Sequence, residues 1–279
     1  MASAGLICRG EEGRRYRLVR PLGTPVRGKG CNVWLGLDDS NPDAEYIMKR
    51  PPGDQIEESW SDALAAFKHE LEMQRLFAKD PMIRRLVDYV PESEPSGPMM
   101  VLEAFTDSLW DARNGVLLGI FTVHMKGLVY TVSKPSTREI TSLTYRSPEV
   151  HFGKPWSSST DVWSWGIILA QLLQAQVDFR SPGMYDSIQT GTLAEKGAVI
   201  RDQLAIDFDL SSVPFYSEDE QCARLLPTPQ PEEAYMWANS MVEKGVSGED
   251  IQFLVEVMNP NPDARLTVRE ILESGYLEI

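Results

Sequence analysis

TSLTYRSPEV at residues 141–150 and STDVWSWGIIL at residues 159–169 are the most informative stretches of this sequence. Three residues that favour the helix N-cap, Ser, Thr and Asp, open the second stretch, and the run 162–173 then has no charge. This pattern predicts a helix that is buried on most sides. The first stretch is polar, contains Pro148 and ends near the carboxylate of Glu149.

The composition is that of a globular protein with one large domain or two lobes around a cleft. The chain has 279 residues, of which 42% are hydrophobic and 24% are charged, and these values are ordinary for a folded domain. The formal net charge of -14 argues against nucleic acid or an anionic membrane as the main partner, because both repel an acidic surface.

The cysteines and the N-terminus predict an intracellular protein, cytoplasmic or nuclear. Cys8, Cys31 and Cys222 lie far apart in the chain, which favours reduced thiols over a disulfide framework or a zinc site. The first ten residues contain no long apolar core, so we expect no signal peptide. No apolar run approaches the roughly 18 residues that span a bilayer. The histidines are scattered, which argues against a metal site.

Hydrophobic periodicity divides the chain near Glu103, with five expected strands and one helix before it and mainly helices after it. Residues 178–232 are rich in Pro, Gly, Ser and Asp, so we expect loops with short helices there. Thr267 is the expected cap of the last helix. The expected strands are 16–20, 33–37, 44–49, 83–89 and 99–102; the expected helices are one around 63–76 and those at 116–124, 162–173, 233–243, 248–257 and 268–274.

GTPVRGKG at residues 23–30 nearly matches the phosphate-binding pattern G-x-x-x-x-G-K-[ST]. The last position of that pattern must supply a hydroxyl group for the metal, and here it is Gly30. The pattern must also open a helix, whereas VWLGL at 33–37 alternates like a strand. We therefore interpret this stretch as a glycine-bearing loop and not as a P-loop.

The two opening stretches resemble the end of a protein kinase activation segment and the central helix after it, with Ser-Pro-Glu in place of Ala-Pro-Glu. The resemblance covers about residues 16–277. It implies an α+β, two-lobed protein-kinase-like fold. Residues 1–15 would be an N-terminal tail, 16–103 a small antiparallel β lobe with one helix, and 104–279 a larger helical lobe, truncated around 110–140.

In kinases a glycine-rich hairpin covers the ATP phosphates, because a bare backbone approaches the oxygens closely. If Val33 is the valine over the adenine, the three glycine positions of the family are occupied by Val26, Gly28 and Cys31. This loop therefore departs from the pattern, although Gly30 can substitute with a small shift. An ordinary glycine hairpin is the alternative.

The resemblance implies further ATP-binding residues. Lys49, in Tyr-Ile-Met-Lys, matches the strand lysine that neutralises the phosphates, and Glu70 matches the helix glutamate that pairs with it. Leu102 resembles the gatekeeper. Glu103 and Phe105 resemble the hinge, where backbone groups would bind adenine.

A second implied pair is structural. Arg265 lies in NPNPDARLT at 259–267, which resembles the loop whose arginine holds the Pro-Glu carboxylate, here Glu149. A guanidinium and a carboxylate form a strong bidentate contact, which would pin the substrate loop to the larger lobe. Asp161 matches the aspartate that holds the backbone of the catalytic loop in the family. We expect it to cap its own helix here.

The resemblance fails at the residues that perform phosphoryl transfer. Active kinases need a catalytic aspartate, an asparagine and an Asp-Phe-Gly aspartate, the last two to hold magnesium. No aspartate occurs between Asp111 and Asp161, and no asparagine occurs between Asn114 and Asn239. The sequence therefore implies no catalytic and no metal-binding residue.

Two registers are open for this region. In the first, VSKP at 132–135 replaces Asp-Leu-Lys-Pro, so that Val132 occupies the catalytic aspartate position and Thr137 the asparagine position. In the second, which we prefer, the catalytic and magnesium loops are missing as a block. Such a gap is either a true loss or an excised stretch of the transcript, and the sequence leaves both open.

Three functions follow from these observations. The chain is an active Ser/Thr protein kinase, a catalytically deficient pseudokinase that acts as a scaffold, or a truncated product. We expect catalytic deficiency, because phosphoryl transfer depends on positioning and on charge neutralisation by metal. ATP is the expected nucleotide, Mg²⁺ is in doubt, and the protein substrate or scaffold partner is unknown.

Overall fold

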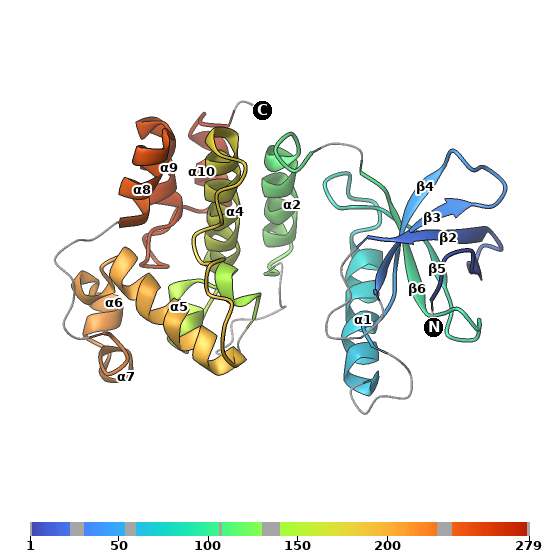
Figure 1. Ribbon diagram of the computed structural model, residues 1–279, viewed down its shortest axis with the longest axis horizontal. Helices are drawn as coiled ribbons and strands as arrows, with labels where there is room; N and C mark the ends of the chain where they lie inside the picture. Colours follow the sequence, from blue (N-terminus) through green and yellow to red (C-terminus); the bar gives the residue numbers. More distant parts are fainter. Residues whose placement is uncertain are drawn as a thin grey trace. The chain divides into compact units, whose positions relative to one another are not determined.

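The computed structural model forms two compact units, Met1–Ser108 and Leu109–Ile279 (Figure 1). The first unit is a β-sheet with one long helix, and the second is helical. The residues that the structure describes are 2–22, 31–53, 60–105, 108–129, 140–227 and 236–277.

The sheet of the first unit has six strands in the order β1-β2-β3-β4-β6-β5, all paired antiparallel. The sequence predicted five, and the additional strand, β1, lies within the segment 1–15 that we predicted as a tail. A three-residue strand is too short to show a period of two. The elements are β1 (Ile7–Arg9), β2 (Arg15–Pro21), β3 (Val33–Asp38), β4 (Glu45–Lys49), α1 (Trp60–Leu76), β5 (Leu86–Val90) and β6 (Met99–Glu103).

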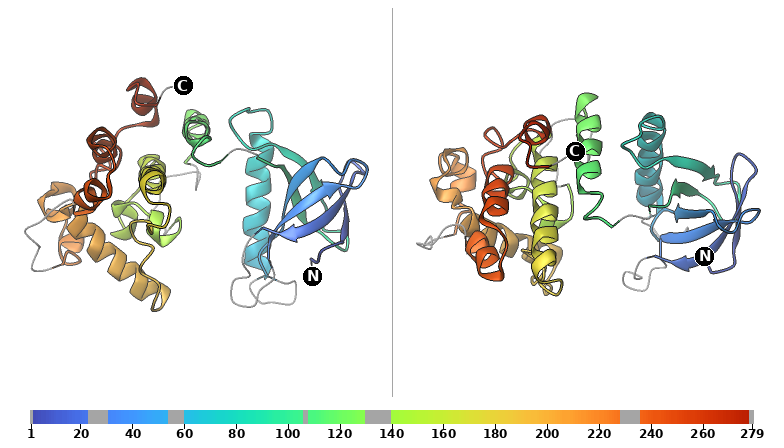
Figure 2. Two further views of the ribbon diagram at one scale, coloured as in Figure 1. Left: turned by 45° about the horizontal axis from the view of Figure 1, so that its top comes forward. Right: turned by 90° about the horizontal axis from the view of Figure 1, so that it is seen from above.

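Strand β6 lies between two hydrophobic clusters. Because side chains alternate between the faces of a strand, Met99 and Val101 enter one cluster with β1, β2 and β4. Met100 and Leu102 enter the other, where they meet Phe67 of α1. Helix α1 therefore lies along one face of the sheet (Figure 2).

The turn between β1 and β2 reaches β5, although β1 and β5 stand at opposite ends of the strand order. The backbone N–H of Glu11 donates to the carbonyl of Tyr89 at 2.8 Å. The hydroxyl of Tyr16 donates to Oδ2 of Asp88 at 3.0 Å, and the Asp88 side chain is buried. The sheet is thus curled, and a buried carboxylate joins its two ends.

Gly10 makes this approach possible. A Cβ atom at Gly10 would lie 1.9 Å from Oδ2 of Asp88. We expect Gly10→Ala to lower the free energy of unfolding by about 1–3 kcal/mol, because Asp88 must move and lose its bond to Tyr16. Gly115→Ala is the control, since a Cβ there meets nothing within 4 Å in helix α2 and should stabilise by about 0.5–1 kcal/mol. Urea unfolding measures both, and equal effects would contradict the prediction.

The second unit is built from helices, as predicted. The predicted boundaries agree for α9 and are a few residues short for α2 and α4. The elements are α2 (Arg113–Met125), η1 (Leu143–Tyr145), α3 (Pro148–His151), α4 (Ser159–Val177), α5 (Leu193–Asp207), η2 (Leu210–Ser212), α6 (Pro214–Ser217), α7 (Glu220–Ala223), α8 (Met236–Lys244), α9 (Gly248–Val257) and α10 (Val268–Glu273).

The prediction of loops with short helices over 178–232 is wrong at α5, a helix of 15 residues. Its start had a signal that we missed. Thr192 and Glu195 form a capping box, in which each side chain bonds the backbone of the other. Thr267 caps α10 in the same way, as predicted. The N-cap of α4 is Ser158, without a side-chain bond.

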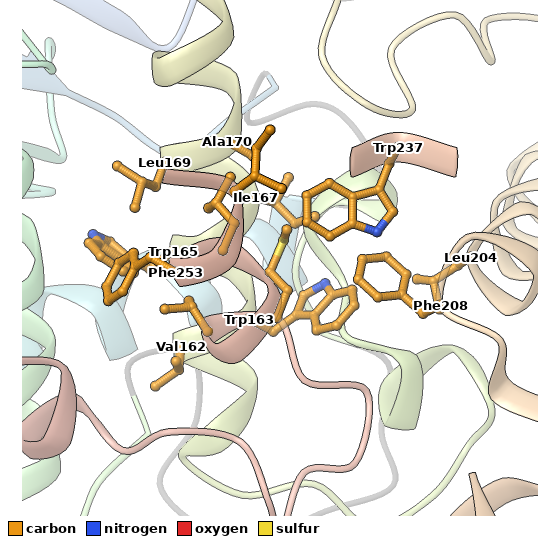
Figure 3. Close-up of a cluster of buried hydrophobic side chains, with 14 of the residues drawn as sticks. Val162, Trp163, Trp165, Ile167, Leu169, Ala170, Leu204, Phe208, Trp237 and Phe253 are labelled. Atoms are coloured by element: carbon orange, nitrogen blue, oxygen red, sulfur yellow. The ribbon is translucent and has the colours of Figure 1, made fainter. Parts of the chain in front are cut away.

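Helix α4 lies in the core of the second unit, as its uncharged sequence predicted. Trp163 packs against Phe208, with ring centroids 4.8 Å apart, and Phe208 stacks on Trp237 at 5.4 Å (Figure 3). On another side of α4, Trp165 meets the edge of Phe253. These aromatic contacts join α4 to α8, to α9 and to the residue that follows α5.

The three cysteines, Cys8, Cys31 and Cys222, are all free thiols, and their side chains are buried.

Among the described residues, none of the helices combines the length and hydrophobicity needed to traverse a bilayer.

Candidate functional site

Lys49 and Glu70 form an ion pair in the first unit. Lys49 is the last residue of β4, and its Nζ lies 2.5 Å from Oε1 of Glu70 in α1. About a third of each side chain is exposed, 32% and 38%. The pair is therefore accessible to a ligand and is not sealed in the core.

The alternation of β4 explains why these residues meet. Tyr46 and Met48 face the cluster on one side of the sheet, and Ile47 packs against the cluster on the other side, where α1 lies. Lys49 shares the face of Ile47 because it is two residues further along the strand. It is also directly opposite Val33 in the ladder between β3 and β4.

Three further residues predicted to bind ATP lie on β6 or shortly after it. Leu102 is buried in the cluster beneath α1, opposite Ile47. Glu103 ends the strand. Phe105 is 60% exposed, and the guanidinium of Arg84 lies 4.3 Å from its ring centroid.

Several predicted positions lie outside the described residues. They are Gly28 and Gly30 of the glycine-bearing loop, and Val132 with the rest of the region whose register was left open. The element after the loop is strand β3 and not a helix. The context that a P-loop requires is therefore not present.

Glu149 and Arg265 form a completely buried pair in the second unit, with both side chains at 0% exposure. Nη1 and Nη2 of Arg265 donate to the two carboxylate oxygens at 2.9 and 3.0 Å. Nε donates to the carbonyl of Asn259 at 2.8 Å, and Nη1 also donates to that of Ser159 at 2.9 Å. The guanidinium therefore joins α3, the start of α4 and the loop before α10.

Asp161 is buried and contacts a partner that the sequence did not indicate. Its Oδ2 lies 3.0 Å from Nε2 of His124 in α2. We expected Asp161 to lose its family partner and cap its own helix. Instead this contact offsets the cost of a buried carboxylate. Next to this contact, the hydroxyl oxygens of Thr160 and Ser147 lie 2.7 Å apart and form a hydrogen bond.

The segment before α3 is held by its own polar contacts. Nε of Arg146 donates to the carbonyls of Ile140 and Thr141, and Ser164 of α4 donates to the carbonyl of Tyr145 at 2.8 Å. Nε2 of His151 lies 3.0 Å from the carbonyl of Leu143. Burial lowers the pKa of His151 to about 4, so the ring is neutral at pH 7 and donates this hydrogen bond.

Residues 126–277 match the family described as the protein kinase domain, and this range is more than half of the chain. The chain belongs to the protein kinase family. The match includes Glu149, Asp161 and Arg265, which the structure brings into the contacts described above.

Two curated relatives of this kinase domain are described as the serine/threonine kinase NLK. That of Caenorhabditis briggsae is 26% identical over 148 residues, and that of Caenorhabditis elegans is 26% identical over 165 residues. Each alignment covers 51% of this chain. The kinase domain spans about a fifth of the length of these relatives, 20% and 21%.

Among solved structures, the kinase domain is similar to a chain in the structure of the CAK complex of Chaetomium thermophilum bound to ATP-γ-S. The TM-score is 0.62 at 18% identity, over 92% of this chain and 89% of that chain. This likeness shows the two-lobed kinase fold, in agreement with the predicted α+β class.

Proposed function

We propose that this kinase-fold domain binds a nucleotide and does not transfer its phosphate. One observation supports this best. The Lys49–Glu70 pair is formed and accessible, while the sequence between Asp111 and Asp161 contains no aspartate. The domain would then act through what it binds, as a scaffold, and not through chemistry of its own.

The residues present fit a nucleoside triphosphate. Lys49 would neutralise phosphate oxygens, and Glu70 would hold its ammonium group in place. Backbone groups from Glu103 to Phe105 would bind the adenine, with Leu102 behind it and Val33 over it. Gly28 and Gly30 would approach the phosphates. When bound, the nucleotide would add the negative charge of its phosphates to the surface of the domain.

The residues present do not fit a magnesium ion held as active kinases hold it. Magnesium prefers carboxylate oxygens in a near-octahedral arrangement. The sequence offers no aspartate between Asp111 and Asp161, where active kinases carry the carboxylate that holds the ion. The proposed function therefore does not involve a magnesium ion.

Thermal melting with ATP tests the binding. We expect ATP at 100 times its Kd to stabilise the wild-type chain by about 2.7 kcal/mol, equally with excess Mg²⁺ and with a chelator. Lys49→Met should lose most of this effect, because the phosphates lose their cation. Lys68→Met is the matched control, since Lys68 is an exposed lysine on α1 that pairs with Glu92. Equal ATP stabilisation of both variants would contradict the assignment.

A transfer assay tests the absence of chemistry. We expect the pure chain to pass no more labelled phosphate to a protein substrate than Lys49→Met does. The alternative is an active Ser/Thr kinase, which family membership favours. Metal-dependent transfer by the wild-type chain that Lys49→Met abolishes would establish that alternative and overturn the proposal.

A further inference from the structure

Two consecutive arginines, Arg84 and Arg85, lie directly before β5 and contact the end of β6 and the residues after it. The carbonyl of Arg85 accepts a hydrogen bond from the backbone N–H of Glu103 at 3.0 Å. Nη2 of Arg85 also lies 3.7 Å from Oε1 of Glu103, but both side chains are exposed, so water weakens this ion pair. The backbone bond therefore fixes the last residue of β6.

Phe105 lies two residues beyond the end of β6, where the pairing of strands no longer fixes the chain. Its side chain is 60% exposed, so burial does little to hold the ring in one place. The guanidinium of Arg84 lies 4.3 Å from the ring centroid, well within the distance of about 6 Å over which a cation attracts an aromatic face. This contact restrains Phe105 where the sheet and the core do not.

The restraint acts on the groups that would bind the base. In the proposed function, backbone groups from Glu103 to Phe105 bind the adenine. A ring held against Arg84 limits the backbone conformations that remain open to Phe105. A binding segment that is ordered before its ligand arrives loses less conformational entropy on binding, and the affinity rises accordingly. The phosphates, in contrast, would interact with Lys49.

We propose that Arg84 is a positioning residue for the purine base, because it holds Phe105 and thereby the backbone that meets the edge of the base. This inference rests on the proposed nucleotide binding. A guanidinium suits the position, since it is planar and weakly hydrated and stacks on aromatic faces more readily than an ammonium group does. Arg84 acts through Phe105 and does not itself touch the nucleotide.

Calorimetric titration of the full chain with ATP and with inosine triphosphate tests the role of Arg84. Inosine triphosphate has the same ribose and phosphates, but its purine edge exchanges donors and acceptors relative to adenine. We expect the wild-type chain to prefer ATP. Arg84→Gln should raise the Kd of ATP about 2–5-fold and change that of inosine triphosphate little. Arg84→Lys should keep part of the preference, because an ammonium group still attracts the ring.

A second arginine that contacts a ring gives the matched control. The guanidinium of Arg75 lies 5.5 Å from the ring centroid of Tyr89, and its side chain is 52% exposed. Arg75→Gln should leave both Kd values unchanged. A double-variant cycle then tests the route, since Arg84→Gln should weaken ATP binding no further once Phe105→Leu has removed the ring. Additive effects of these two substitutions would overturn the inference.

The possible outcomes separate this inference from the proposed function. If the wild-type chain binds ATP and Arg84→Gln binds it equally well, the inference fails and nucleotide binding stands. Equal weakening of both nucleotides also overturns the inference, because positioning of the base predicts a selective loss. If the wild-type chain does not bind ATP, both fail. Arg84→Met, which keeps an apolar side chain without the charge, decides in the same way if Arg84→Gln does not fold.

Discussion

Arg265→Met is expected to lower the free energy of unfolding by about 3–5 kcal/mol, because it leaves the carboxylate of Glu149 buried without its cation. Both side chains are fully buried, and the contact is bidentate. The substitution also removes the donors to the carbonyls of Asn259 and Ser159. Chemical denaturation of the wild-type and variant chains measures the loss.

A matched surface pair separates burial from charge. Arg224 and Glu220 are 73% and 82% exposed, so Arg224→Met should cost less than about 1 kcal/mol. The double variant Arg265→Met with Glu149→Met should recover much of the loss, since it removes the unpaired charge as well. If Arg265→Met costs no more than Arg224→Met, the buried pair does not hold α3 as we describe.

The second large effect is a loss of stability in acid that depends on His151. Its pKa is lowered to about 4, first by burial and then by Arg146 and Arg201. In the unfolded chain this pKa is about 6.5. Below pH 6.5 the unfolded state binds a proton that the folded state does not, so stability falls as the pH falls from 6.5 to about 4. The expected loss is about 3 kcal/mol.

His151→Gln should flatten this pH dependence, because glutamine can still donate to the carbonyl of Leu143 but does not titrate. His69→Gln is the control, since His69 lies exposed on α1 and its replacement should leave the profile unchanged. Denaturant midpoints from pH 7 to pH 4 measure all three chains. A His151→Gln profile as steep as that of the wild type would show that other groups cause the acid sensitivity.

Local patterns predicted much of the fold. The uncharged run after Ser159 predicted α4, and Thr267 predicted the start of α10, because caps and periodicity act within one element. The short strand β1 and helix α5 were missed. β1 has only three residues. In α5 the exposed Leu193 and Val199 blur the apolar face, and Gly197 weakens the helical pattern.

The candidate site shows the same division between local and long-range information. Motif spacing predicted the pairs Lys49–Glu70 and Glu149–Arg265 from the sequence alone, because each residue occupies a position that the resemblance to kinases defines. The contact of His124 with Asp161 was not predicted, since the residues are 37 positions apart and no motif joins them.

The sequence alone determined the family, the order of most helices and strands, and the absence of aspartate between Asp111 and Asp161. These properties depend only on the identity of the residues and on short spacings along the chain. Tertiary structure alone decided which buried charges are paired. Burial and hydrogen bonding depend on residues that folding brings together from distant positions, and no local pattern encodes them.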